Sequence, residues 1–446
     1  MHAFFDRRRL WVLAAGLLAV GASAEARADG AFPDSLQVLL PSDRPNEIGL
    51  ATNFGLIVSE DAGQTWQWVC EVDALQSANL YQVGPPPLDR MFAVSNAGVV
   101  WSDDVACTWQ IAGGLLAGTI VQDVFPDPSN AQHVLAVAVP ENGTGPGTAA
   151  VFESSDGGVT FDRVLFQIGD AADAITGVEI AASDPNTIYV PFYATPGPHP
   201  KLARTVDGGM TWETADLEPS IGSAFARIIA VDRSDPRRLY FRVEGASSEA
   251  LGISNDGGST IATPVSVNGL IGGFAILPSG TIVVGGRVVV NGTMTGAAFR
   301  SRDGGNTFEP WPNAPRVRAL AQRDGLLYVA ADNVRDGFAL AVSPDEGTAI
   351  TPVMRYADVS AIKACVGQTC GQSCGYEAGL GVWASSTCGK YGTTGVGGAG
   401  GGIDQPQGCG CAIDGGATGL DAGWVVAVLC GLILRTRRLR RTPASA

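Results

Sequence analysis

The chain has 446 residues, of which 46% are hydrophobic and 16% are charged. Its formal net charge of −15 argues against nucleic-acid binding, which requires a basic surface. Only three histidines are present, His2, His133 and His199, and His2 lies in a segment that we interpret as a removable signal. A three-histidine metal site is therefore excluded, and we expect neither a metal nor a cofactor.

The first 28 residues have the composition of a secretory signal peptide. Three arginines at 7–9 precede an apolar core at 10–20, and small-x-small cleavage sites end at Ala24 and Ala28. The alternative is an uncleaved membrane anchor, but the apolar run is short for a membrane span. We predict a signal peptide at 1–28 and an exported protein, in which disulfides can form.

The middle of the chain repeats one eight-residue pattern, which we call the box: Ser or Thr, any residue, Asp, any residue, Gly, any residue, Thr and an aromatic residue. Its seven aspartates are spaced 43, 52, 51, 49, 47 and 42 residues apart. They are Asp61, Asp104, Asp156, Asp207, Asp256, Asp303 and Asp345, with degenerate boxes at the second, fifth and seventh. A period of about 40–50 residues is typical of β-propeller blades.

The segments between the boxes support this interpretation. Each unit contains four short runs with strand-like alternation, such as 176–181, 187–193, 202–205 and 211–215 in the fourth unit. Seven units of about 46 residues fill positions 35–356, which suits four-stranded blades. We predict an all-β, seven-bladed propeller that closes without a strand swapped in from the far end of the chain.

Each residue type of the box suits a tight turn between the third and fourth strands. The glycine permits positive φ, and the aspartate and threonine can bond the turn amides. The aromatic residue can pack between sheets. The repeat resembles the Asp-box, or bacterial neuraminidase repeat, of sialidases, sortilin-type receptors and photosystem assembly factors, over about 320 residues. This resemblance implies that the seven aspartates are structural, because in those families the box turns lie away from the active site.

The resemblance does not extend to a sialidase active site. Sialidases with this fold carry an arginine triad, a Tyr–Glu nucleophile pair, an acid Asp and a Phe/Tyr-Arg-Ile-Pro element before the first box. This chain has no such element before Asp61. The nearest match, Phe241-Arg242-Val243-Glu244, falls in the fifth unit and is interpreted as an ordinary second strand.

The first strand of each blade should line the centre of the propeller, which exposes four weak catalytic candidates: Asp123, Glu179, Arg227 and Arg318. Asp123 and Glu179 belong to consecutive blades, so they can approach each other and act as a glycosidic acid/base pair. The alternative is that inward carboxylates solvate a wet channel or pair with arginine.

We therefore favour a non-catalytic module that binds a protein or a glycan, with a glycoside hydrolase as the second hypothesis. A propeller presents variable loops on a rigid scaffold. The longest expected connections between second and third strands are 140–148 and 195–200, both rich in Gly and Pro.

Six cysteines precede the tail. Cys365, Cys370, Cys374 and Cys388 predict a small disulfide-stapled module at 357–390, with three pairings open. Zinc is the alternative, but their spacing matches no common zinc motif. Cys70 and Cys107 lie in the propeller, and we predict that they pair with each other. The objection is that they can lie toward opposite faces of their blades.

The C-terminus carries a second composite signal. A glycine-rich spacer at 391–408 precedes Cys409-Gly410-Cys411, and an apolar run at 424–434 ends in five arginines. The segment 409–441 resembles the MYXO-CTERM sorting signal. This resemblance implies recognition by a membrane protease, cleavage near Cys409 or Cys411, and display at the cell surface. The alternatives are a plain C-terminal membrane anchor, whose basic flank would remain in the cytoplasm, and a disulfide between the two cysteines.

Overall fold

The computed structural model describes residues 33–71, 75, 78, 80–117, 119–142, 145–170 and 173–391. All of them belong to one compact unit of the chain, Met1–Thr394. The predicted signal peptide, the glycine-rich spacer beyond residue 391 and the segment with Cys409 and Cys411 lie outside the described residues. In the described part, no helix is both long and apolar enough to cross a membrane.

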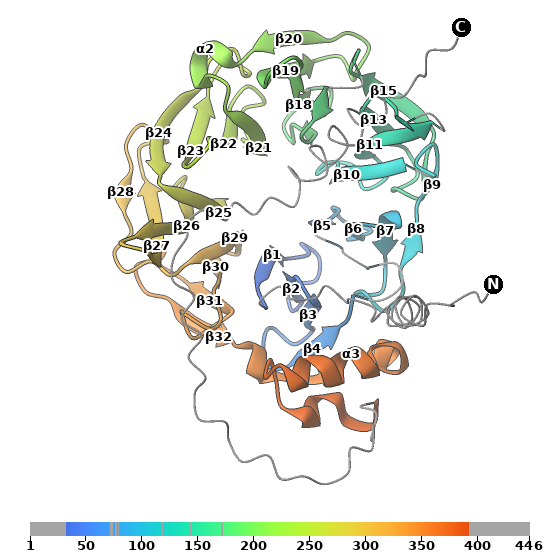
Figure 1. The fold of residues 1–446 in the computed structure, drawn as a ribbon, viewed down its shortest axis with the longest axis vertical. Coiled ribbons are helices and arrows are strands. Elements are labelled where there is room, and N and C mark those ends of the chain that lie inside the picture. Colours follow the sequence, from blue (N-terminus) through green and yellow to red (C-terminus); the bar gives the residue numbers. More distant parts are fainter. Residues whose placement is uncertain are drawn as a thin grey trace, which may run out of the picture. The chain divides into compact units, whose positions relative to one another are not determined.

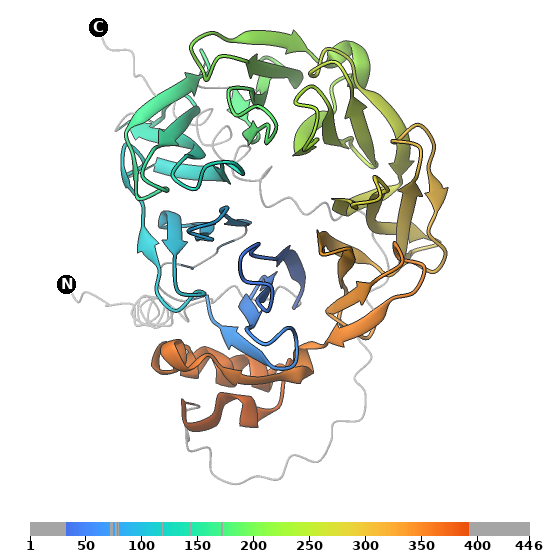
Figure 2. The same ribbon diagram turned by 180° about the vertical axis from the view of Figure 1, so that it is seen from behind.

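Seven blades of four strands surround a central axis, which confirms the predicted all-β, seven-bladed propeller (Figures 1 and 2). In each blade the first strand lies nearest the axis and the fourth lies at the rim. Blades 1 to 3 contain β1 (Ser35–Leu39), β2 (Ile48–Thr52), β3 (Gly55–Ser59) and β4 (Trp66–Val69); β5 (Leu80–Val83), β6 (Met91–Ser95), β7 (Gly98–Ser102) and β8 (Gln110–Ile111); and β10 (Thr119–Pro126), β11 (Val134–Asn142), β13 (Ala150–Ser154) and β15 (Arg163–Gln167), with β12 (Gly145–Pro146) paired to β11.

The remaining blades follow the same order along the chain. Blades 4 to 7 contain β16 (Ala174–Ile175) with β17 (Glu179–Ile180), β18 (Ile188–Ala194), β19 (His199–Thr205) and β20 (Glu213–Asp216); β21 (Phe225–Val231), β22 (Leu239–Glu244), β23 (Glu249–Ser254) and β24 (Ala262–Val267); β25 (Gly269–Ile276), β26 (Ile282–Val290), β27 (Thr293–Ser301) and β28 (Glu309–Pro310); and β29 (Val317–Arg323), β30 (Leu326–Ala331), β31 (Leu340–Ser343) and β32 (Thr351–Met354). A short parallel pair, β9 (Gly113–Gly114) with β14 (Thr160–Phe161), links the second blade to the third. The helix α2 (Glu218–Ile221) follows β20.

The middle strands form because their side chains are apolar on both faces. Every residue of β2 and β3 is buried, since each blade packs between two others. The inner strands of five blades contain a one-residue register shift against their second strand. Such bulges increase the local twist of a strand, which fits sheets arranged radially around an axis.

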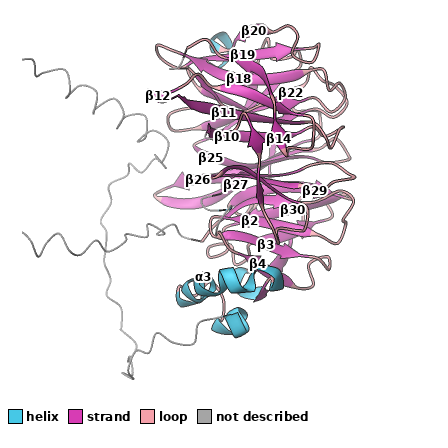
Figure 3. Ribbon diagram, turned by 90° about the vertical axis from the view of Figure 1, so that its right-hand side faces the viewer, coloured by secondary structure: helices cyan, strands magenta, loops and turns pink. Residues whose placement is uncertain are grey.

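The antiparallel order of each blade creates two distinct faces. Connections between strands 1 and 2, and the box turns between strands 3 and 4, emerge at one face, which we call the box face. Connections between strands 2 and 3 emerge at the opposite face, which we call the hairpin face. Figure 3 shows the propeller edge-on, with β12 protruding from the hairpin face.

The propeller closes as predicted, and one further strand that the sequence did not predict pairs with its rim. Each blade uses its own consecutive strands, and no strand is swapped from the far end. A further strand, β33 (Val359–Ile362), pairs in parallel with β4 at the rim of blade 1, with Val359 opposite Trp66 and Ile362 opposite Trp68. It covers the backbone edge that β4 would otherwise expose, and open edges invite pairing with other chains.

The segment after β32 packs against blades 1 and 2. It contains η2 (Tyr356–Asp358), η3 (Ala364–Val366), α3 (Gly367–Gly379) and η4 (Ser385–Tyr391). Trp383 lies 4.9 Å from Trp68, measured between ring centroids, and the Lys363 ammonium bonds the Val105 carbonyl in blade 2 (3.0 Å).

The predicted Cys70–Cys107 disulfide is wrong. Cys70 pairs with Cys370 and Cys107 pairs with Cys365, with Cα separations of 5.5 and 5.6 Å. The physical reason is the course of the C-terminal segment, which passes both blades at their rim and places one cysteine beside each. The expectation of a self-contained four-cysteine module is corrected too, because only Cys374–Cys388 lies within the segment.

Candidate functional site

The box aspartates direct their carboxylate oxygens into their own turns. Asp207 accepts bonds from the Thr211 hydroxyl (2.6 Å), the Thr205 hydroxyl (2.7 Å) and the Thr211 amide (2.9 Å). The degenerate seventh box keeps this geometry, since Asp345 accepts from the Ala349 amide (2.8 Å) and the Ser343 hydroxyl (2.7 Å). Oxygens occupied in this way are poorly placed for catalysis, which agrees with the structural role expected from the sequence.

We expect Asp207→Asn to lower the protein's stability at neutral pH and to make that stability less dependent on pH. The Thr211 hydroxyl, then the Thr205 hydroxyl and the Thr211 amide, lower the pKa of Asp207 to about 2. A folded pKa below the unfolded value near 4 stabilises the protein above that value, and this stability is lost as pH falls through the folded pKa. Melting temperatures of both proteins between pH 2 and 7 provide the test. The variant should have a lower melting temperature than the wild type at pH 7, and its melting temperature should fall less as the pH is lowered. Parallel curves of melting temperature against pH would contradict a stabilising carboxylate.

Two of the four catalytic candidates meet in neighbouring blades. Asp123 on β10 accepts one amide bond per oxygen, from Val124 (2.9 Å) and Val178 (3.0 Å). Burial raises the pKa of Asp123 to about 7, against those amide bonds and the nearby Arg227. Burial also raises the pKa of Glu179 on β17 well above its usual range, and the Asp123 carboxyl adds to this shift. The two groups therefore interact electrostatically, as their consecutive blades suggested.

The two arginines do not join them in one catalytic set. The Arg227 guanidinium on β21 pairs with Glu244 (3.0 Å) and influences Asp123 only through space. Arg318 on β29, in blade 7, pairs with Asp34 (2.9 Å) and Asp332 (3.3 Å). Arg318 therefore stands apart from the other three candidates, and Arg227 lies near Asp123 but has its guanidinium held by Glu244.

An aromatic pair beside Arg227 could not be identified from the sequence. The rings of Tyr193, at the end of β18, and Phe225, at the start of β21, meet edge to face with centroids 4.5 Å apart. Phe225 is 43% exposed, and the side chain of Arg227 is 49% exposed. Aromatic residues and arginine are enriched in protein interfaces, so this group has the composition of a contact surface.

Six exposed apolar side chains, spread over four blades, lie on the same hairpin face. Register places each of them at the strand ends or connections of that face. They are Ile120, Phe225, Leu270, Val289, Val290 and Val334, exposed by 50, 43, 39, 56, 51 and 58%. They come from blades 3, 5, 6 and 7, so the exposure is a property of the face rather than of one loop.

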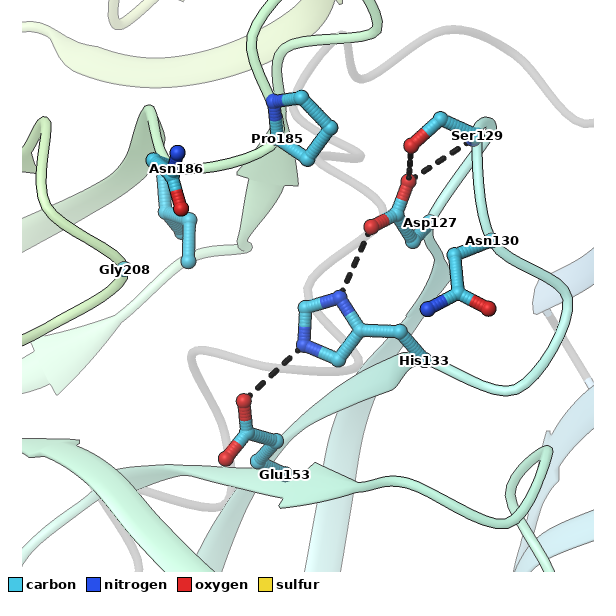
Figure 4. A pocket seen from close by; sticks show the side chains of 9 residues that line it. Asp127, Ser129, Asn130, His133, Glu153, Pro185, Asn186 and Gly208 are labelled. Carbon is cyan, nitrogen blue, oxygen red and sulfur yellow. Dashed lines mark hydrogen bonds and ion pairs between the residues drawn. The ribbon is translucent and has the colours of Figure 1, made fainter.

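The box face contains a cavity of about 420 Å³ between blades 3 and 4 (Figure 4). His133 lies in one wall, and its ring nitrogens contact Asp127 (2.8 Å) and Glu153 (3.1 Å). Burial opposes the charged ring, but the bonds to both carboxylates raise the pKa of His133 to about 9. Asn186 and Gly208, from blade 4, form the opposite wall. The sequence held no signal for this cavity.

Comparison with known proteins shows no family for this chain. No protein-family model and no curated protein matches the chain. Solved structures that resemble it include a GH74 enzyme from Niastella koreensis (14% identity, 72% of this chain and 65% of that one, TM-score 0.42). Others are the extracellular domain of a putative one-component system from B. thetaiotaomicron (12%, 70% and 39%, 0.48) and YCF48 from Cyanidioschyzon merolae (16%, 66% and 92%, 0.44). The chain spans less than two thirds of the length of the first two.

Proposed function

We propose that this protein is an exported binding module, displayed at the cell surface, which contacts a protein or glycan through its hairpin face. Three disulfides suit an oxidising compartment outside the cytoplasm. The repeated turns support membership of the Asp-box class of propellers. A sorting protease would cleave near Cys409 or Cys411, and the C-terminal segment would provide the membrane attachment.

The distribution of exposed apolar side chains carries this proposal. Six large apolar side chains lie exposed on the hairpin face, whereas the box turns of the opposite face expose Val159, Val206 and Met210. Gatherings of exposed apolar groups with aromatic and arginine neighbours mark interaction surfaces. On the hairpin face, the Tyr193–Phe225 pair and Arg227 provide those neighbours.

The test is binding of the labelled mature protein to a glycan array and to intact cell envelopes of the source organism. A Phe225→Ser, Leu270→Ser variant should bind at least about tenfold more weakly, because truncating a buried interface anchor commonly costs 2 kcal/mol or more. Met210→Ser is the matched control, since Met210 is 79% exposed but lies on the box face. Equal loss in both variants, or no loss in the first, would refute the hairpin face as the contact surface.

Glycoside hydrolysis is the second candidate, and the Asp123–Glu179 pair favours it. Burial raises the pKa of both carboxyl groups, which suits a general acid, whereas its partner in a glycosidase must stay ionised. Against it, both Asp123 oxygens already accept backbone amides. Fluorogenic glycosides test it directly: turnover that disappears in both Asp123→Asn and Glu179→Gln would establish the hydrolase.

A further inference from the structure

Cationic side chains bridge the blades on the box face. Arg90 of blade 2 donates to the Gly157 carbonyl (2.6 Å), and Arg300 of blade 6 donates to the Glu346 carbonyl (3.2 Å). Gly157 and Glu346 each directly follow the box aspartate of the next blade. Each bridge therefore ties one blade to the box turn of its successor.

The same contact recurs at two more junctions, and related contacts occur at two others. Lys363 donates to the carbonyl of Val105, and Arg238 of blade 5 donates to the carbonyl of Gly304; both acceptors follow a box aspartate. Arg204 of blade 4 lies against Gly257, where an added Cβ would overlap its guanidinium. Between blades 7 and 1, Arg323 donates to the Glu47 carbonyl (2.8 Å). Six of the seven junctions thus have an arginine or lysine that reaches the neighbouring backbone.

The junction between blades 3 and 4 differs. Its corresponding acceptor is Gly208, which follows Asp207, and no arginine or lysine of the described residues donates to the Gly208 carbonyl. His133 directly precedes the second strand of its blade, the position that Arg90 and Arg238 occupy in theirs. Imidazole is shorter than the arginine side chain, and its two nitrogens are taken up by carboxylates of blade 3.

The cavity is what this shorter side chain leaves. It occupies the junction between His133 on one side and Asn186 and Gly208 on the other (Figure 4). At the junctions between blades 2 and 3 and between blades 5 and 6, Arg90 and Arg238 place a guanidinium at this position. The Gly208 carbonyl is therefore the acceptor at this junction, and the described residues provide no arginine or lysine that donates to it.

We propose that the cavity between blades 3 and 4 binds the arginine side chain of a protein partner, which takes the place of the missing bridge. A guanidinium is planar and carries five donors, so it can bond the Gly208 carbonyl and the Asn186 side-chain oxygen together. The carboxylates of Asp127 and Glu153 lie in the cavity wall, where they offset the positive charges of the His133 ring and of Arg163, which pairs with Glu153. The net charge of −15 attracts basic segments to the protein. This second contact surface goes beyond the proposed function, because it lies on the opposite face of the propeller.

The probe is a short peptide, acetyl-Gly-Arg-Gly-amide, titrated into the mature protein by calorimetry and by NMR of the His133 ring. The matched peptide contains citrulline, which has nearly the same shape without the charge. We expect the arginine peptide to bind with a dissociation constant on the order of 1 mM, to shift the His133 ring signals, and to bind at least about tenfold more tightly than the citrulline peptide. Equal affinity of the two peptides, or no binding of the arginine peptide, would overturn the proposal.

A substitution tests the location. His133→Arg restores the bridge from within, so this variant should lose peptide binding while its melting temperature stays equal or rises. Met210→Ser, on an exposed box turn next to the cavity, should bind the peptide as the wild type does. Undiminished binding by a folded His133→Arg protein would contradict the site. These results do not depend on the hairpin face, whose own variants report separately.

Discussion

A Cys70→Ala, Cys370→Ala double variant should lose about 4 kcal/mol of unfolding free energy. The bond joins residues 300 apart, but the Cys107–Cys365 bond remains and shortens the loop that Cys70–Cys370 closes to about 42 residues, for which the chain-entropy model gives about 4 kcal/mol. It also links the rim of blade 1 to α3, where β33 pairs with β4. Replacing both cysteines avoids an unpaired thiol. Urea unfolding of purified, oxidised protein measures the loss.

The third disulfide provides the control. Cys374 and Cys388 are 14 residues apart, so a Cys374→Ala, Cys388→Ala variant should lose only about 3 kcal/mol by the same model. Both pairs are buried, which makes the lost packing comparable. A smaller loss for the long-range pair than for the short-range pair would show that the C-terminal segment does not clamp the propeller.

Trp68→Ala should cost about 3–5 kcal/mol, the range for a large aromatic residue removed from a core. Its side chain is 1% exposed, and its indole nitrogen donates to the Phe54 carbonyl (3.0 Å). The ring also contacts Trp383, so the change loosens blade 1 and the C-terminal segment together. Chemical unfolding monitored by circular dichroism measures the cost.

Trp212→Ala is the comparison, because Trp212 is only partly buried although its ring lies 4.7 Å from Phe166. It should cost clearly less than Trp68→Ala. If the two substitutions cost the same, burial between blade 1 and the C-terminal segment would not be the source of the effect.

The sequence predicts the fold well because the repeat is local. Each box fixes a turn with its own residues, so seven boxes at blade-length spacing define seven blades even where a copy is degenerate. Asp345 shows this, since its turn forms without the threonine of the stronger copies.

The C-terminal segment is predicted less well because its partners are distant in sequence. β33 is a four-residue strand that pairs in parallel with β4 across nearly 300 positions, and no local pattern encodes such a pairing. The Cys70 and Cys107 pairings depend on the same path, so cysteine counting identifies the six participants but not the bonds.

The candidate sites also include one feature that the repeat predicts and others that depend on contacts between distant residues. The approach of Asp123 and Glu179 follows from their positions in consecutive inner strands. Arg318 is held away from Asp123 and Glu179 by its ion pairs with Asp34 and Asp332, and the repeat does not encode these pairs. The cavity beside His133 depends on side-chain length across one blade junction, and it becomes visible only when the seven junctions are compared.

The most direct test of the central claim measures binding and turnover in one experiment on glycans that the protein retains. The mature protein and its Asp123→Asn and Glu179→Gln variants are incubated with those glycans, and both the bound fraction and the released products are quantified. A binding module should leave the glycans intact, and both variants should bind as the wild type does, whereas the Phe225→Ser, Leu270→Ser variant should not. Product release by the wild type that disappears in both carboxyl variants would contradict the account and establish an enzyme.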